Sequence, residues 1–171
     1  MGQKAWTWEH QALVRARVIA GDQALAEEFN VLRKEILTRP RDDKKLRKDI
    51  VEMREKLRSA KKYSHTDEFD LKQGHGGIVD IEFMVQYMVL RWAHQYPPLT
   101  RHTESLELLD TLAGLELLDP NHHRILSGAL SSWLDKSYQL KLNDHAAVIP
   151  DSIDKPLRLE VVEIWKNMFA R

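Results

Sequence analysis

Along nearly the whole chain, apolar residues recur every three or four positions, which is the spacing of a helix and not of a strand. We therefore expect seven helices, over residues 5–20, 23–38, 42–62, 78–95, 103–118, 119–142 and 156–170. The predicted fold class is all-α, a helical bundle of about seven helices that forms a single helical domain over residues 1–171. At most one short isolated strand is expected, near residues 69–72, and it would need a partner from outside the chain.

The helix over residues 78–95 is apolar nearly all round, which predicts that it lies at the centre of the core. By contrast, the highly charged run from Arg41 to Arg58 indicates a helix with a solvated face, packed along the narrow stripe Leu46, Ile50, Met53 and Leu57. The stripe of the helix over residues 23–38 consists of Leu25, Phe29, Leu32 and Ile36.

Composition excludes several classes of function. Lys and Arg together number 26, as do Asp and Glu, so no net charge attracts the whole chain to nucleic acid or to an anionic membrane. The chain has no cysteine, which excludes a disulfide scaffold and fits a reducing compartment. It has no run of about 18 apolar residues. We expect a cytoplasmic protein with no nucleic acid or membrane partner, and one that resembles a piece of something longer.

A glycine-rich segment precedes the central helix. Lys72 is followed by Gly74, Gly76 and Gly77, and the last glycine leads directly into residues 78–95. Glycine-rich backbone at a helix N-terminus presents N–H groups to an anion, and a neighbouring lysine adds charge. The same residues are also typical of a tight turn that lets a helix pack closely.

Two acids follow the glycines, and they are not expected to share a metal ion. Positions 80 and 82 point roughly 200° apart on a helix, so no metal site is predicted here. Asp80 is interpreted either as a first-turn acid, favoured by the helix dipole, or as a cleft-lining group. Glu82 falls in the apolar arc and should have a cationic partner, because burying an unpaired carboxylate costs several kcal/mol. The candidate partners are Arg15, Arg17, Lys72 and Arg101.

Several blocks of sequence together carry a family resemblance. The blocks are Ala5–Arg17, Met53–Lys56, Phe69–Lys72, Gly76–Phe83 and Gln86–Tyr87. In order and interval they resemble the glutamine synthetase adenylyltransferases, the bifunctional adenylyltransferase and adenylyl-removing enzymes of bacterial nitrogen control. The resemblance covers essentially the whole chain. Val79-Asp80-Ile81-Glu82-Phe83 is similar to the C-terminal, adenylylating half of such enzymes.

The resemblance implies that this chain is the helical region that follows a catalytic nucleotidyltransferase domain, because the family's Gly-Ser-x-x-Asp-x-Asp metal motif is missing. No catalytic residue and no metal ligand are then expected here, and the chain alone should be inactive. The implied reaction of the whole enzyme transfers AMP from ATP, with Mg²⁺, to a tyrosine of glutamine synthetase. Neither ATP nor Mg²⁺ is expected to be bound to this part alone.

By the same resemblance, Lys72, Gly76 and Gly77 would lie near phosphate. Asp80, Glu82, Arg15 and Arg17 would line the cleft or hold the structure together. The implied partners are the adjacent nucleotidyltransferase domain, glutamine synthetase and the PII signal protein. Two alternatives stay open: a regulatory module that binds PII or glutamine, and the helical domain of a PII uridylyltransferase.

Overall fold

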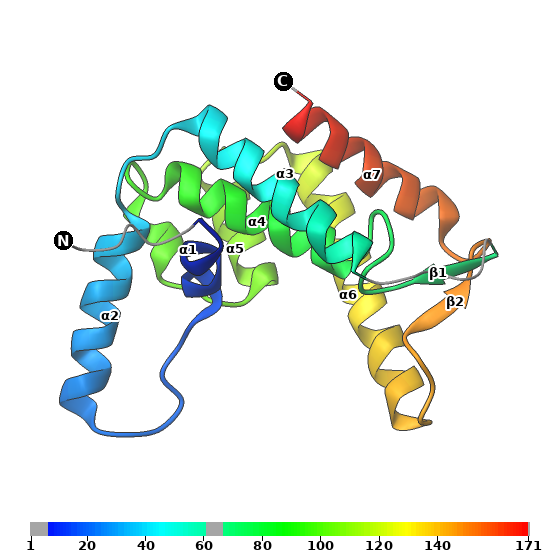
Figure 1. Cartoon of the computed structure of the whole chain (residues 1–171), viewed down its shortest axis with the longest axis horizontal. Helices are drawn as coiled ribbons and strands as arrows, with labels where there is room; N and C mark the ends of the chain where they lie inside the picture. Colours follow the sequence, from blue (N-terminus) through cyan, green and yellow to red (C-terminus); the bar gives the residue numbers. More distant parts are fainter. Residues whose placement is uncertain (1–6, 61–66, 171) are drawn as a thin grey trace.

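The computed structural model describes residues 7–60 and 67–170, and in this part of the chain it contains seven α-helices, a short 3₁₀ helix and two short strands (Figure 1). In chain order they are α1 (Thr7–Arg15), α2 (Gln23–Leu37), α3 (Asp43–Ser59), β1 (Glu68–Asp70), α4 (Ile78–Trp92), η1 (Pro97–Thr100), α5 (Ser105–Gly114), α6 (Pro120–Leu142), β2 (Val148–Pro150) and α7 (Lys155–Phe169). The predicted mostly helical bundle is confirmed. Residues 5–6 and 61–62, at the ends of two predicted helices, lie outside the described residues.

Aspartates define the first turns of three helices. Asp22 accepts a hydrogen bond from the amide of Leu25, and Asp42 accepts one from that of Lys45. Asp119 does the same at the start of α6, where Pro120 occupies the first turn. Such caps satisfy amide groups that have no partner within the helix. They explain why these three boundaries agree with the sequence prediction to within one residue.

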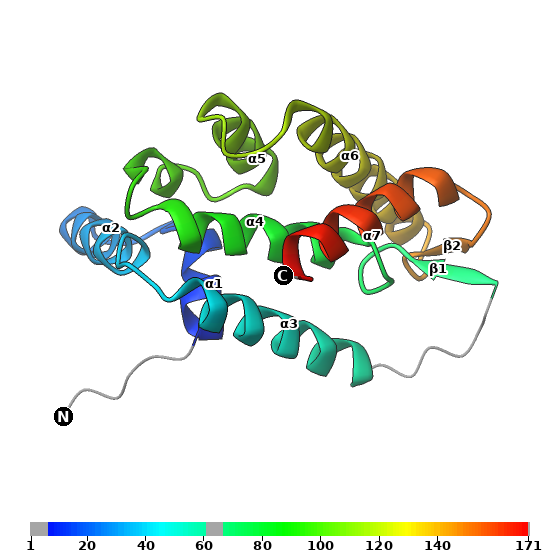
Figure 2. The same ribbon diagram turned by 90° about the horizontal axis from the view of Figure 1, so that it is seen from above.

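Helix α4 lies at the centre of the core, as predicted. It contacts α1, α3, α5, α6, α7 and η1. Figure 2 shows it between α3 on one side and the α5–α6 pair on the other. Ile81, Met84, Val89 and Leu90 on this helix have no exposed surface. Burying side chains of this size contributes about 1.5–3 kcal/mol each, so α4 is the main apolar support of the fold.

The first helix is shorter than predicted, because it ends at Arg15 and not near residue 20. The side chain of Arg33 on α2 donates to the carbonyl oxygens of Leu13 and Val14, at 2.7 Å each. These hydrogen bonds satisfy carbonyls at the end of the helix. Residues 16–19 then follow without regular structure, before the bend at Gly21. Arg17 therefore lies in the connection that follows α1.

The fifth helix also ends early, at Gly114 instead of residue 118. The amide of Leu117 donates to the carbonyl of Leu112 at 2.9 Å, and Glu116 has a positive φ of 57°. A left-handed residue of this kind turns the chain away from the helix axis while satisfying one of its last carbonyls.

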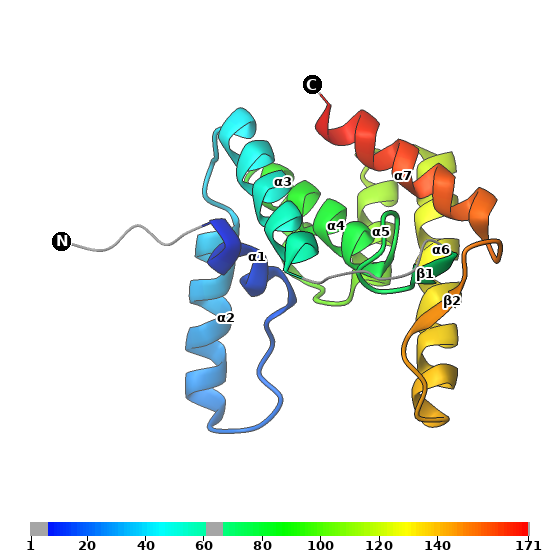
Figure 3. The same ribbon diagram turned by 45° about the vertical axis from the view of Figure 1, so that its right-hand side comes forward.

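Helix α2 stands apart from the rest of the bundle, and much of its predicted apolar stripe is exposed. Figures 1 and 3 show it projecting away from the other helices, and it packs on α1 and η1. Leu25 and Leu32 of the stripe are 66% and 50% exposed, and the neighbouring Val31 is 69% exposed. The face that α2 buries contains Arg33 and Leu37 instead.

The short strand has its partner within the chain, which corrects the expectation that it would be isolated. β1 pairs antiparallel with β2, and Phe69 lies opposite Ile149. Phe69 is buried against Trp133 of α6, with ring centroids 5.7 Å apart. The two strands therefore fasten the start of the glycine segment to the C-terminal part of the bundle. None of the helices in the described ranges is long and apolar enough to cross a membrane.

Candidate functional site

The glycine segment joins β1 to α4 through a compact set of hydrogen bonds. The Asp70 carboxylate accepts from the amides of Lys72 and Gln73, at 2.8 Å each. The amide of Gly77 donates to the carbonyl of Gly74 at 2.9 Å, and that of Ile78 donates to Leu71 at 2.8 Å. The loop is therefore a closed turn in which most backbone amides donate to acceptors within the chain.

Gly76 is the glycine of this turn that also has a positive φ. Its φ is +78°, and a Cβ atom there would lie 2.8 Å from the carbonyl oxygen of Arg158 on α7. An L-residue is strained in this conformation, and the backbone contact leaves no room for a side chain. The glycine thus allows the loop to pack directly on α7.

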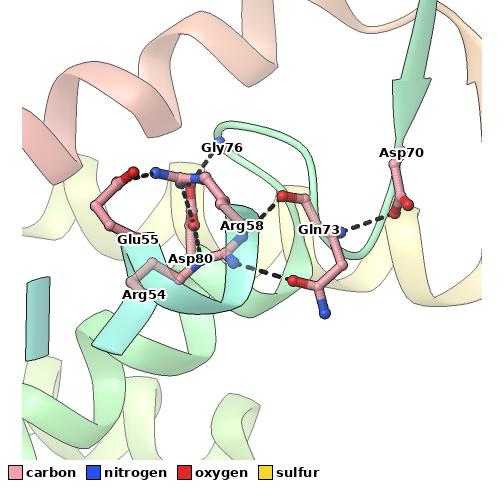
Figure 4. A network of polar contacts seen from close by, with 7 residues as sticks. All are labelled: Arg54, Glu55, Arg58, Asp70, Gln73, Gly76 and Asp80. Carbon is pink, nitrogen blue, oxygen red and sulfur yellow. Dashed lines mark hydrogen bonds and ion pairs between the residues drawn. The ribbon is translucent and has the colours of Figure 1, made fainter. Parts of the chain in front are cut away.

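The amide of Gly76 does bind an anion, and that anion is the Asp80 carboxylate. The donor nitrogen lies 2.7 Å from Asp80 Oδ2. Arg54 Nε lies 2.6 Å from Oδ1, and Arg58 Nη2 reaches both oxygens at 2.7 and 2.6 Å (Figure 4). Arg54 also donates to Gln73, to the side-chain oxygen at 3.0 Å and to the main-chain oxygen at 2.8 Å. We call these five residues the Asp80 network.

The Asp80 network is buried. Asp80 is 1% exposed and Arg54 has no exposed surface. A buried ion pair is stable only where additional hydrogen bonds satisfy both partners, and here each carboxylate oxygen accepts two. The network connects α3, α4 and the glycine segment, so its chemical role is to hold these three elements in one arrangement.

The position of Arg54 and Arg58 corrects the interpretation of residues 41–58 as a solvated face. Arg54 is fully buried and the Arg58 side chain is 10% exposed, whereas Leu57 of the predicted stripe is 42% exposed. The buried side of α3 therefore follows Ile50, Arg54 and Arg58, which are four residues apart. This spacing was the available signal for these two arginines, and the sequence reasoning missed it because both are charged.

The two acids of α4 also differ from expectation in their burial. Asp80, interpreted mainly as a first-turn acid, is the deeply buried one, while the Glu82 side chain keeps 18% of its surface exposed. They bind different arginines and point to different sides of the helix, as the geometry predicted. Asp80 is fixed by α3, and Glu82 faces α1.

Glu82 pairs with Arg15, one of its four candidate partners. Burial raises the pKa of Glu82, while the charges of Arg15 and Lys72 act in the opposite direction. Lys72 itself is exposed. Arg17 is not part of this pair, because its guanidinium lies 2.9 Å from Glu104. Arg15, Lys72 and Glu82 thus form an outer charged cluster that is separate from the Asp80 network.

The predicted site residues therefore divide into two groups. Gly76 and Asp80 belong to the buried network, and Gly77 uses its amide within the turn. Arg15, Lys72 and Glu82 gather at the surface. Within the described ranges, no three His, Asp or Glu side chains are grouped as a metal site would need. The nearness of Lys72, Gly76 and Gly77 to phosphate stays a prediction.

Comparison with known proteins adds the class to which this arrangement belongs. Residues 1–32 match the family model of glutamate-ammonia ligase adenylyltransferase, and residues 44–145 match that of GlnD PII-uridylyltransferase. Both models are named for nucleotidyltransferases, so the chain is similar to part of proteins of that class. The Asp80 network lies inside the segment matched by the second model.

A curated relative refines this assignment. The chain is 43% identical over 165 residues to the bifunctional glutamine synthetase adenylyltransferase/adenylyl-removing enzyme of Nitrosococcus oceani. The match covers 96% of this chain and 17% of that relative. The chain belongs to the glutamine synthetase adenylyltransferase family, and it spans about a sixth of the length of the relative. The resemblance seen in the sequence is confirmed.

Proposed function

We propose that this chain is a helical accessory domain of a cytoplasmic glutamine synthetase adenylyltransferase. In that enzyme it supports the transfer of AMP from ATP to a tyrosine of glutamine synthetase, and it is inactive alone. The observation that carries the proposal is the exposed apolar face of α2, formed by Leu25 and Leu32. A helix with such a face is typical of a surface that another domain covers.

The occupant we propose for this face is the nucleotidyltransferase domain. The face lies in residues 1–32, the part matched by the adenylyltransferase model, while most of the buried core lies in the segment matched by the other model. The matched region is 17% of the relative's length, which leaves ample chain in such an enzyme to cover α2. The apolar face and the family assignment thus support the same partner.

The contacts of the site residues favour a role in holding the loop in place over a direct role in the reaction. Asp80 and Glu82 are both engaged by arginines, so they do not fit the ligand set of a Mg²⁺ ion. The Gly76 and Gly77 amides donate within the chain, which leaves the exposed ammonium of Lys72 as the group able to reach a phosphate. We propose that the Asp80 network holds the loop so that Lys72 borders the nucleotide cleft of the neighbouring domain.

Replacing Lys72 in the full-length enzyme tests this role. Lys72→Ala should reduce adenylylation of glutamine synthetase by roughly tenfold or more, the loss expected for one charge-assisted contact. Its melting temperature should not change, because the side chain is exposed. The matched control is Lys44→Ala, which removes an exposed lysine that lies on α3, away from the glycine segment. Unchanged activity in the Lys72 variant, or a parallel loss of activity and stability, would exclude the role.

A second candidate is favoured by the match of residues 44–145 to the PII-uridylyltransferase model. In that case the substrate of the full enzyme would be PII and the transferred group UMP. Assays with ATP and glutamine synthetase, and with UTP and PII, separate the two activities. A third candidate, a regulatory module, predicts that this chain alone binds PII or glutamine, which calorimetric titration of the two ligands would detect.

A further inference from the structure

A cationic cavity lies between the α1–α2 connection, α2 and η1. Its volume is about 520 Å³, within the range of roughly 300–1,000 Å³ that small-molecule sites occupy. Four cationic side chains line it, and among the described lining residues none is acidic. The four are Arg17, Arg33, Lys34 and Arg101.

Arg33 forms the base of this cavity and carries a charge that no carboxylate neutralises in the described part of the chain. Its guanidinium donates to the carbonyl oxygens of Leu13, Val14 and Thr100, at 2.6 to 2.7 Å, and to that of His102 at 3.3 Å. The residue is 6% exposed. Carbonyl dipoles satisfy its donors, but they leave the net positive charge of the group in place. The field of this buried charge therefore extends into the cavity.

The other cations are available to a ligand. Lys34 and Arg101 are exposed, and neither side chain forms an ion pair within residues 7–60 and 67–170. Arg17 is paired with Glu104, and both side chains are more than half exposed. An exposed pair of this kind contributes only about 0–1 kcal/mol, so a more highly charged anion can replace Glu104.

We propose that this cavity binds a small phosphate-bearing anion. Three accessible cationic side chains, from three separate segments, surround the cavity, and the buried Arg33 lies at its base. This arrangement favours a multiply charged ligand over a single carboxylate. Guanidinium groups match the geometry of phosphate oxygens, and the cavity also offers the polar side chains of Asn30 and Thr103. This inference does not depend on the proposed accessory role, because it concerns residues outside the Asp80 network.

Titration of the 171-residue chain with tripolyphosphate, followed by calorimetry and by NMR shifts of α2 and η1 amides, tests the proposal. Tripolyphosphate should bind, and the double variant Lys34→Gln/Arg101→Gln should bind it at least about tenfold more weakly, from the loss of two charge-assisted contacts. Arg33 is left unchanged because it closes α1. Both substituted side chains are exposed, so the variant should melt like the wild type.

The matched control is Lys44→Gln/Lys141→Gln, which removes two exposed cations that do not line the cavity. Its affinity for tripolyphosphate should stay within about twofold of the wild type. Absence of binding, equal weakening in both double variants, or shifts confined to other helices would each overturn the proposal.

Further titrations with ATP and adenosine distinguish the source of the phosphate. Equal affinity for ATP and tripolyphosphate would indicate a site that reads phosphate groups alone, and tighter binding of ATP would indicate a nucleotide site. Both results support phosphate recognition. Binding of adenosine as tight as that of ATP would contradict it.

Discussion

Substitution of Asp80 by asparagine should destabilise the fold strongly, because it removes the charge that satisfies two arginines. Arg54 has no exposed surface and would keep its positive charge without a carboxylate partner. Leaving one member of a buried ion pair unpaired costs about 3–5 kcal/mol. The total stability of a domain is about 5–15 kcal/mol, so the loss is a large share of it.

The assay is denaturant unfolding of the 171-residue chain, followed by circular dichroism, together with a thermal melt. A change of 1 kcal/mol shifts the melting temperature of a chain this size by roughly 2–4 °C, so Asp80→Asn should lower it by roughly 6–20 °C. Glu82→Gln is the matched control, since it makes the same chemical change on the same helix. Its partner Arg15 is 44% exposed, so the cost should stay below about 1 kcal/mol.

The reasoning would be refuted if Asp80→Asn and Glu82→Gln reduced the free energy of unfolding equally, or if Asp80→Asn cost less than about 1 kcal/mol. A double-mutant cycle adds a further check. Arg54→Met combined with Asp80→Asn should cost less than the sum of the single changes, because the buried charge leaves together with its partner.

Three further predictions concern other parts of the chain. Burial raises the pKa of Glu82, so the folded state keeps this proton to higher pH than the unfolded state and stability falls as pH rises above the ordinary carboxyl range. Glu82→Gln should flatten the urea-derived stability profile in that range, and an unchanged slope would contradict this. Gly76→Ala should lower stability by about 1–3 kcal/mol, whereas Gly128→Ala, where a Cβ meets nothing within 4 Å, should raise it by up to about 1 kcal/mol; equal effects in thermal melts would argue against the close packing on α7. Leu25→Ser/Leu32→Ser should change the stability of this chain by no more than about 0.5 kcal/mol per site but should lower the adenylylation activity of the full-length enzyme; a large loss of stability in the isolated chain would mean that α2 is already covered.

The sequence predicted what local patterns determine. Seven helices and the central place of α4 followed from spacing and apolar content. The set of candidate partners for Glu82 contained the correct one, Arg15. These features depend on contacts within a helix, or on a requirement that any buried carboxylate must meet.

Local sequence patterns could not predict the contacts between distant segments. Arg54 and Asp80 are 26 residues apart, and no periodic pattern pairs them. Phe69 and Ile149 pair across β1 and β2, two strands of three residues each, which are too short for alternation to be visible. The exposure of Leu25 and Leu32 likewise escaped prediction, because an apolar stripe indicates that a face will be covered without indicating by what.

Arg33 donates hydrogen bonds to two carbonyls of α1 and to those of Thr100 and His102, and these bonds have a mechanical consequence. Together with the buried Leu37 and with Arg41, which donates to the carbonyl of Leu90 on α4, this guanidinium fixes how α2 sits on the bundle. A force that a covering domain exerts on α2 would therefore reach both α1 and the segment that follows α4 partly through Arg33. The projecting helix is thus tied through one side chain to two segments that are far apart in the sequence.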